Sequence, residues 1–162
     1  MNQSLFQNIK IKKEFFQDLP TIFADATQLK QVFLNIILNA AQAMEGKGEL
    51  AITTWQDKND IKIKIRDTGP GVPPEQVGKL FNPFFTTKEK GTGLGLAISY
   101  GVIERHSGKI DVETELGKGS TFTISLPIGN SEKDFQDETK IELIQNIKTG
   151  RKNNEQKKDL NN

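Results

Sequence analysis

Hydrophobic residues recur every three or four positions in two segments of the chain, which is the period of an α-helix. The first predicted helix runs from Asp25 to Met44, and Asp25 is expected to cap its first turn. The second runs from about Gly93 to His106, and Ser107-Gly108 ends it. The apolar side of the first helix carries Leu29, Val32, Phe33, Ile36, Ile37, Ala40 and Met44, and that of the second carries Leu94, Ala97, Ile98 and Val102.

Alternating hydrophobic and polar residues in five further segments predict strands. They cover residues 9–15, 50–55, 61–67, 110–114 and 120–126. Turn residues at 57–60 and 116–119 predict that the last four strands form two antiparallel hairpins. Ile61, Ile63 and Ile65 would face the helices and the basic residues between them would face water. The pattern predicts an α/β (α+β) fold of two layers, in which helices cover one face of a mixed, mostly antiparallel sheet.

Two segments depart from these regular patterns. Residues 68–91 form a long loop rich in Gly, Pro, Asn and Thr, with a short helix predicted near 74–80. After Pro127 the chain becomes polar and charged, so we expect a domain over residues 1–128 and a tail or linker over 129–162. The tail also contains one candidate amphipathic helix, which carries Ile141, Leu143, Ile144 and Ile147.

Composition narrows the classes of function. The chain has 162 residues, 35% of them hydrophobic, and its 22 basic and 21 acidic residues give a net charge of +1. A balanced charge favours neither nucleic acid nor an anionic membrane as partner. With 0 cysteines, thiolate catalysis and cysteine-based zinc sites are excluded. No apolar run is long enough to span a bilayer, so a cytoplasmic location is expected, with a membrane-anchored parent protein left open.

Amide side chains form a second stripe along the first predicted helix, at Gln28, Gln31, Asn35, Asn39 and Gln42. One interpretation is an exposed polar face. Asparagine is unfavourable in the middle of an exposed helix, however, and Asn35 and Asn39 lie one turn apart. We therefore expect these two residues to contact phosphate or a hard cation such as Mg²⁺, which prefers oxygen ligands.

Asp67 continues the inward face of its predicted strand, and Ser120 begins the inward face of the last strand. A carboxylate and a hydroxyl at adjacent strand ends could read the edge of adenine, with Gly69 and Gly71 allowing the base to approach. The alternative is that Asp67 only caps the turn that follows it.

The segment from Gly91 to Leu96 has the sequence GTGLGL and is predicted to place free N–H groups at the start of a helix, where they can hold phosphates. It fails the dinucleotide-binding GxGxxG pattern. Phe81, Phe84 and Phe85 need burial, either in a small satellite core or in a lid that brings Lys88 to phosphate. His106 is expected to cap the second helix.

Four motifs together resemble the catalytic and ATP-binding domain of two-component sensor histidine kinases, within the GHKL superfamily that includes gyrase, mismatch-repair and chaperone ATPases. They are NIILNAAQAM (N box), DTGPGV (G1 box), LFNPFF (F box) and GTGLGL (G2 box), within a match over about residues 8–127. The resemblance implies a Bergerat-type ATP-binding fold. It also implies that Asn39 binds Mg²⁺, with Asn35 nearby, and that Asp67 binds the adenine amine.

Asn35, Asn39 and Lys88 are the expected catalytic residues. The expected ATP-binding residues are Asn35, Asn39, Ala43, Asp67, Gly69, Gly71, Val72, Phe81, Thr87, Lys88, Gly91, Thr92, Gly93, Leu94, Gly95, Leu96 and Ser120. By the resemblance, ATP and Mg²⁺ are the cofactors. The reaction it implies is transfer of the γ-phosphoryl group to a histidine on a dimerisation and phosphoacceptor domain, in cis or in trans, with a response regulator downstream.

Three departures from the family pattern shape this expectation. Members that hydrolyse ATP carry glutamate at the position of Asn35, so little ATPase activity is expected. No basic residue occurs from Ala40 to Ala43, where many sensor kinases have one, so phosphate neutralisation would rest on Lys88 and Mg²⁺. No phosphoacceptor motif precedes Asn8, so the chain is expected to act as a catalytic fragment. The alternatives are a regulatory ATP-binding module without transfer activity, or another GHKL ATPase or serine kinase.

Overall fold

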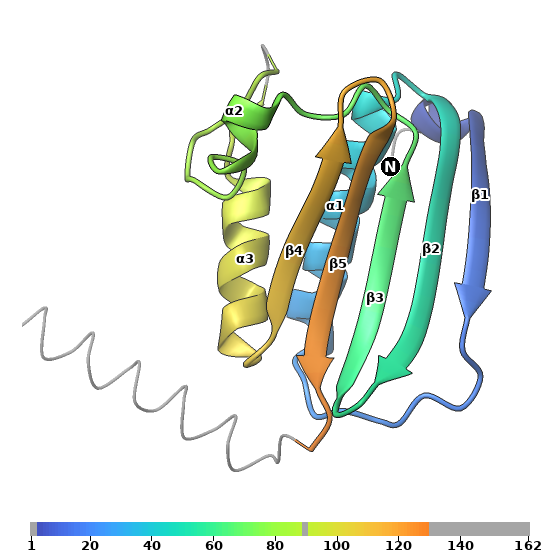
Figure 1. The fold of residues 1–162 in the computed structure, drawn as a ribbon, viewed down its shortest axis with the longest axis vertical. Coiled ribbons are helices and arrows are strands. Elements are labelled where there is room, and N and C mark those ends of the chain that lie inside the picture. Colours follow the sequence, from blue (N-terminus) through green and yellow to red (C-terminus); the bar gives the residue numbers. More distant parts are fainter. Residues whose placement is uncertain (1–2, 89–90, 130–162) are drawn as a thin grey trace, which may run out of the picture. The chain divides into compact units, whose positions relative to one another are not determined.

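The computed structural model describes residues 3–88 and 91–129, which form a five-stranded sheet with helices on one face (Figure 1). The tail predicted from residue 129, including its candidate helix, lies outside the described residues from residue 130 onward. The elements are η1 (Gln3–Phe6, a 3-10 helix), β1 (Asn8–Phe15), α1 (Ala26–Ala43), β2 (Lys47–Asp57), β3 (Asp60–Asp67), α2 (Pro74–Val77), α3 (Gly95–Arg105), β4 (Lys109–Glu115) and β5 (Gly119–Pro127).

The strands lie in the order β1-β2-β3-β5-β4. β1 runs parallel to β2 and the other three pairs are antiparallel, which confirms a mixed, mostly antiparallel sheet. Both predicted hairpins are present, because Asp57 pairs with Asp60 and Glu115 with Gly119. This order places β3 at the centre and brings its last residue, Asp67, beside the start of β5, although more than fifty residues separate the two along the chain.

α1 and α3 lie side by side against one face of the sheet (Figure 1). Val32 and Ile36 of α1 are fully buried, and so are Ile103 of α3 and Ile124 of β5. This is where the hydrophobic core lies, and removal of each large aliphatic side chain from water stabilises the fold by about 1.5–3 kcal/mol.

The predicted buried side of the second helix was partly wrong. Ile98 is 50% exposed, whereas the neighbouring Ser99 is fully buried. Ser99 accepts a hydrogen bond from Asn35 Nδ2 (3.3 Å) and donates one to Gly95 O (2.8 Å). A small residue is therefore needed where α3 approaches α1, and the apolar stripe rotates away from Ile98 toward Val102 and Ile103.

Polar contacts join the N-terminal end of α1 to the C-terminal end of α3. Asp25 Oδ1 accepts hydrogen bonds from the amides of Thr27 (2.8 Å) and Gln28 (3.0 Å), as predicted for an N-cap. The Asp25 amide in turn donates to His106 Nε2 (3.0 Å), and Nδ1 lies 2.8 Å from Val102 O. Because Nε2 accepts, the neutral ring carries its proton on Nδ1. His106 is thus the C-cap of α3, as predicted, and also fixes α3 to the start of α1.

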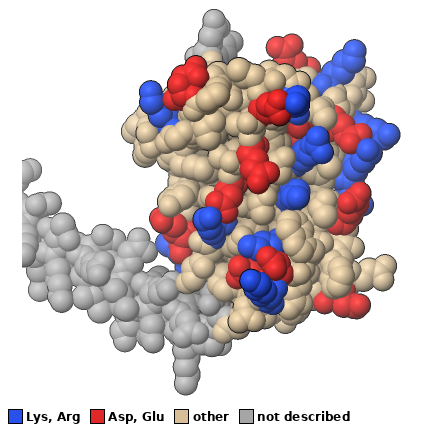
Figure 2. All heavy atoms as spheres, viewed as in Figure 1, with Lys and Arg blue, Asp and Glu red and all other residues tan. Residues whose placement is uncertain are grey.

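The opposite face of the sheet is uncovered within the described residues, and charges of both signs are interspersed on it (Figure 2). Surface ion pairs include Lys12 with Glu49 (2.8 Å) and Lys109 with Asp111 (2.8 Å). Such exposed pairs add little to the stability of the fold, because water and salt screen the charges. Among the described residues, no helix has the length and apolar character that crossing a membrane requires.

Candidate functional site

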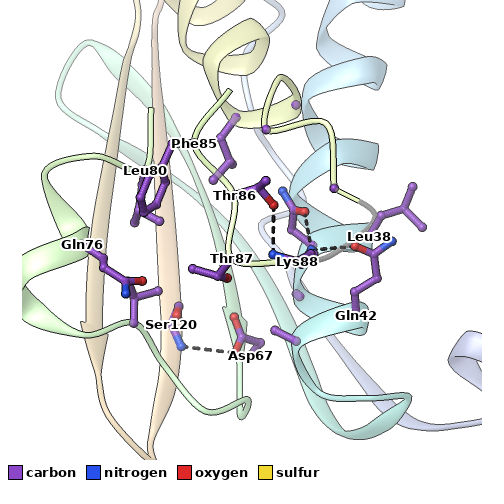
Figure 3. A pocket seen from close by; sticks show the side chains of 18 of the residues that line it. Leu38, Gln42, Asp67, Gln76, Leu80, Phe85, Thr86, Thr87, Lys88 and Ser120 are labelled. Carbon is purple, nitrogen blue, oxygen red and sulfur yellow. Dashed lines mark hydrogen bonds between the residues drawn. The ribbon is translucent and has the colours of Figure 1, made fainter. Parts of the chain in front are cut away.

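A cavity of about 770 Å³ opens where the end of β3 and the start of β5 meet the second half of α1 and the start of α3 (Figure 3). Described residues of the loop between β3 and α3, among them Val72, Leu80 and Lys88, line a further side of it. Most of the predicted site residues line it: Asn35, Asn39, Ala43, Asp67, Gly71, Val72, Thr87, Lys88, Gly91, Thr92, Gly93, Gly95, Leu96 and Ser120. Three predicted residues do not: Gly69, Phe81 and Leu94.

Asp67, the last residue of β3, lines the cavity and is only 4% exposed. Its Oδ1 accepts hydrogen bonds from the amides of Gly69 (2.8 Å) and Ser120 (3.2 Å). Burial raises the pKa of this carboxyl group, and these two hydrogen bonds oppose the rise. Both act on Oδ1, so among the described residues Oδ2 is left without a protein partner and is available to a ligand.

Ser120 reaches Asp67 through its backbone amide, not through its hydroxyl group. The Ser120 hydroxyl lies 3.0 Å from Thr114 Oγ1, which also accepts a hydrogen bond from the amide of Val72 (2.9 Å). These contacts tie the loop after β3 to the β4–β5 hairpin. The Ser120 hydroxyl group is buried at this strand end and its partner in this structure is a threonine, so its contact with adenine stays a prediction.

The structure shows a steric reason for glycine at position 71, and Gly71 also lines the cavity, as expected. It has φ +72°, and a Cβ atom at this position would come 2.2 Å from Glu115 O. The absence of a side chain therefore allows the loop to pass over the β4–β5 turn, where the Gly117 amide donates to Pro70 O (2.8 Å). A Cβ at Gly69 would lie 2.9 Å from Asp67 Oδ1. Both glycines shape the loop that surrounds the carboxylate.

Asn35 and Asn39 project from α1 into the cavity. Asn35 Nδ2 donates to Gly95 O (3.2 Å) and Ser99 Oγ (3.3 Å), which orients its amide group toward α3. Asn39 Oδ1 accepts from Lys88 Nζ (2.9 Å), so in this structure a positive charge already lies against that oxygen. The described residues hold no cluster of three or more acidic or histidine ligands. The donor set fits a hard cation such as Mg²⁺ only if phosphate oxygens complete its coordination.

Lys88 Nζ also donates to Gln42 Oε1 (2.6 Å). The side chain reaches across the cavity from the loop to α1, and partial loss of water lowers the pKa of its ammonium group. Its backbone amide donates to Thr86 Oγ1 (3.1 Å), which fixes the turn that directs the side chain inward. Lys88 is therefore held by neutral amide oxygens of α1.

The GTGLGL segment leads directly into α3, whose first intrahelical hydrogen bond runs from Ile98 N to Leu94 O (2.9 Å). The earlier amides of the first turn, at Gly95, Leu96 and Ala97, have no intrahelical acceptor. Gly95 and Leu96 line the cavity. Gly93 has φ +66°, and a Cβ there would come 2.4 Å from the Phe84 carbonyl carbon. This close approach turns the chain so that the positive end of α3 points into the cavity.

The expectation that all three loop phenylalanines are buried was wrong. Phe84 is 74% exposed, and its φ of 67° is unusual for a bulky residue. The Phe84 amide donates to Gly93 O (3.0 Å), so backbone pairing with the glycine segment sets this conformation. Phe85 lines the cavity. Phe81 instead packs against the hydrophobic core and the ring of Tyr100, with centroids 5.4 Å apart.

Several residues that line the cavity were not predicted as part of the site. Gln42, Thr86 and Gln76 add polar groups, while Leu38, Leu80, Phe85 and Phe122 add an apolar wall. The spacing of Gln42 from Asn35 and Asn39 was a usable signal, since seven and three residues return to the same helix face. Phe85 was named in the interpretation of the loop as a lid, whereas Leu38, Leu80 and Phe122 gave no such signal, because their side chains resemble ordinary core residues.

The sequence of this chain is similar to that of known ATP-binding kinases. The family model described as histidine kinase-, DNA gyrase B-, and HSP90-like ATPase matches residues 24–130. Sporulation kinase E of Bacillus subtilis (strain 168) is 41% identical over 84% of the chain, and sensor histidine kinase ZraS of Escherichia coli (strain K12) is 45% identical over 73%. The chain spans only 19% and 25% of these two relatives.

Solved structures of histidine kinases are also similar to this chain. The nucleotide-free catalytic domain of histidine kinase ThkA superimposes with a TM-score of 0.67 at 37% identity, over 74% of this chain and 79% of that domain. Full-length ShkA in complex with AMPPNP superimposes with a TM-score of 0.68 at 34% identity, over 76% of this chain and 26% of ShkA.

Proposed function

This chain belongs to the family of histidine kinase-, DNA gyrase B- and HSP90-like ATPases, and we propose that its cavity binds ATP for transfer of the γ-phosphoryl group to a histidine outside the described residues. Within the family, it is an ATP-binding catalytic domain of the histidine kinase type. The observation that carries the proposal is Asp67: a buried carboxylate that lines the cavity, with Oδ1 bound to protein and Oδ2 available. We place the boundary of this domain near residue 128.

The adenine ring lies at the sheet end of the cavity. Asp67 Oδ2 accepts a hydrogen bond from the exocyclic amine, while Oδ1 remains fixed by Gly69 and Ser120. Leu80 and Phe122 contribute apolar contacts to the flat faces of the base. A site built to accept from an amine disfavours guanine, which presents a carbonyl oxygen at the corresponding edge.

The phosphates extend from there toward α3 and Lys88. The first-turn amides of α3 and the glycine segment before it offer N–H donors, and Lys88 supplies a positive charge. Asn39 Oδ1, with Asn35 nearby, would hold Mg²⁺, which supplies charge neutralisation of the phosphates when bound. Positioning and charge stabilisation therefore account for the part of catalysis that we assign to this domain.

The transfer breaks the bond between the γ-phosphorus and the β–γ bridging oxygen and forms a bond to an imidazole nitrogen of the acceptor, with ADP leaving. The attacking nitrogen uses its lone pair, and the other nitrogen of the ring then releases its proton to solvent. His106, the only histidine of the chain, is 2% exposed with both ring nitrogens engaged. The acceptor is therefore a histidine on a dimerisation and phosphoacceptor domain, and a response regulator would receive the group next. The amide group of Asn35 cannot act as a general base for water, which favours transfer over hydrolysis.

A mixing experiment tests this proposal. The full chain is incubated with Mg²⁺ and ATP labelled at the γ position, together with a purified histidine-bearing phosphoacceptor domain from one of the relatives. We expect label on the acceptor that is lost in acid and stable in base, and none with Asn39→Leu. ATP binding without transfer would support a regulatory module instead, and release of phosphate without an acceptor would support a self-contained ATPase.

A further inference from the structure

Two amide side chains of α1 share the ammonium group of Lys88 at one side of the cavity (Figure 3). Lys88 Nζ lies 2.9 Å from Asn39 Oδ1 and 2.6 Å from Gln42 Oε1. The two acceptors are three residues apart on α1 and therefore lie on one face of the helix. The shorter of the two contacts is the one to Gln42.

The charge of Lys88 is not balanced by a carboxylate in the part of the chain that the structure describes. The ion pairs found there use other lysines, at positions 12, 62, 109 and 118. Neutral carbonyl oxygens hold Lys88 in place without neutralising it. This arrangement keeps a full positive charge available to an anionic ligand in the cavity.

We infer that Gln42 is a positioning residue, which keeps the Lys88 ammonium group beside the phosphates once Asn39 turns its oxygen to a metal ion. The inference rests on the proposed function. An ammonium group and a divalent cation repel each other when they share one carbonyl oxygen, so Lys88 would have to leave Asn39 if that oxygen held Mg²⁺. Gln42 is not a proposed metal ligand, and its contact with Lys88 can persist through this exchange.

The loop supports the same role. Thr86 Oγ1 accepts from the Lys88 backbone amide (3.1 Å), so the base of the side chain is held while its end is held by Gln42. A lysine side chain has many rotamers, and restricting them before the ligand arrives reduces the entropy lost on binding. Gln42 thereby compensates for the absence of a basic residue on this stretch of α1.

A double-mutant cycle on the full chain tests the inference. Calorimetry gives the dissociation constant of ATP with Mg²⁺ for the intact chain, Gln42→Met, Lys88→Met and the double variant. Methionine keeps the length and helix propensity of glutamine but removes the acceptor oxygen. Gln31→Met is the matched control, because Gln31 is an exposed amide on the same helix. Adenosine serves as a second ligand that lacks phosphates.

We expect Gln42→Met to weaken ATP binding about three- to tenfold and to leave adenosine binding unchanged. In the Lys88→Met background the same substitution should change ATP binding by about twofold at most. An equal loss in both backgrounds, or no loss beyond that of Gln31→Met, overturns the inference. Failure of the intact chain to bind ATP, or unchanged binding by Asp67→Asn, overturns the proposed function and the inference with it.

Discussion

Asp67→Asn separates the binding role of this carboxylate from any structural role. The asparagine Oδ1 can still accept the hydrogen bonds that Gly69 and Ser120 donate to Asp67 Oδ1, at 2.8 and 3.2 Å. The atom that changes is Oδ2, which becomes an NH₂ donor and faces the amine of adenine with another donor. The fold should therefore survive while the contact to the base is lost.

The magnitude follows from the hydrogen bond that disappears. A bond to a charged acceptor contributes about 1.5–3 kcal/mol, which corresponds to roughly a 10- to 150-fold weaker dissociation constant for ATP. The opposed donors move the effect toward the upper end of this range. Asp57→Asn is the matched control, because Asp57 is an exposed carboxylate at the β2–β3 turn, remote from the cavity.

Calorimetric titration with ATP, with and without Mg²⁺, measures this loss, and chemical denaturation measures stability. Burial raises the pKa of Asp67 from its ordinary value of 3.8, so as pH rises the unfolded chain releases this proton before the folded chain does. Stability from this group thus falls from about pH 3.8 up through the folded pKa, and stays lower above it. The Asp67→Asn variant has no carboxyl group to ionise at this position. Its free energy of unfolding, relative to that of the intact chain, should therefore increase as pH rises across this window. Binding equal to that of Asp57→Asn would refute the adenine assignment, and unfolding at neutral pH would refute the structural reasoning.

Three further predictions concern the loop and the helix contacts. Gly71→Ala should destabilise the fold by about 1–3 kcal/mol in denaturant titration, because a Cβ at φ +72° meets Glu115 O. Gly78→Ala is the control and should cost less, because a Cβ there meets nothing within 4 Å. Equal effects of the two substitutions would contradict the steric argument. His106→Ala should lower the free energy of unfolding by about 2–4 kcal/mol in the same assay, because it leaves the Asp25 amide without its acceptor and opens a cavity. A change below about 0.5 kcal/mol would show that this contact between α1 and α3 is dispensable. Phe84→Asn should leave the free energy of unfolding unchanged or raise it by up to about 1 kcal/mol, since the ring is exposed and asparagine tolerates the positive φ of this position. A marked loss of stability would mean that the ring makes stabilising contacts.

Local patterns in the sequence predicted most of the secondary structure. The Asp25 cap, the course of α1 and both hairpins depend on side chains within a few residues of each other, so their signals lie in short windows. α2 is shorter than predicted, at Pro74–Val77, because its segment has too few apolar positions to pack a longer helix. Ile98 was misplaced because the neighbour that decides which side of α3 is buried is Asn35, sixty-three residues earlier.

For this protein, the sequence by itself determined the family, the two-layer fold and most of the residues around the cavity, because the four motifs carry their chemistry in local residue types. Only the tertiary structure decided how those residues meet: that Ser120 reaches Asp67 by its amide, that Phe84 is exposed, and that Gln42 and Asn39 share Lys88. The contacts of Asp67 with Ser120 and of Lys88 with α1 join segments that are distant in the chain. The distances between these atoms follow from strand order and helix packing. Local propensity and periodicity contain no information on such distances, so folding of the whole domain has to supply it.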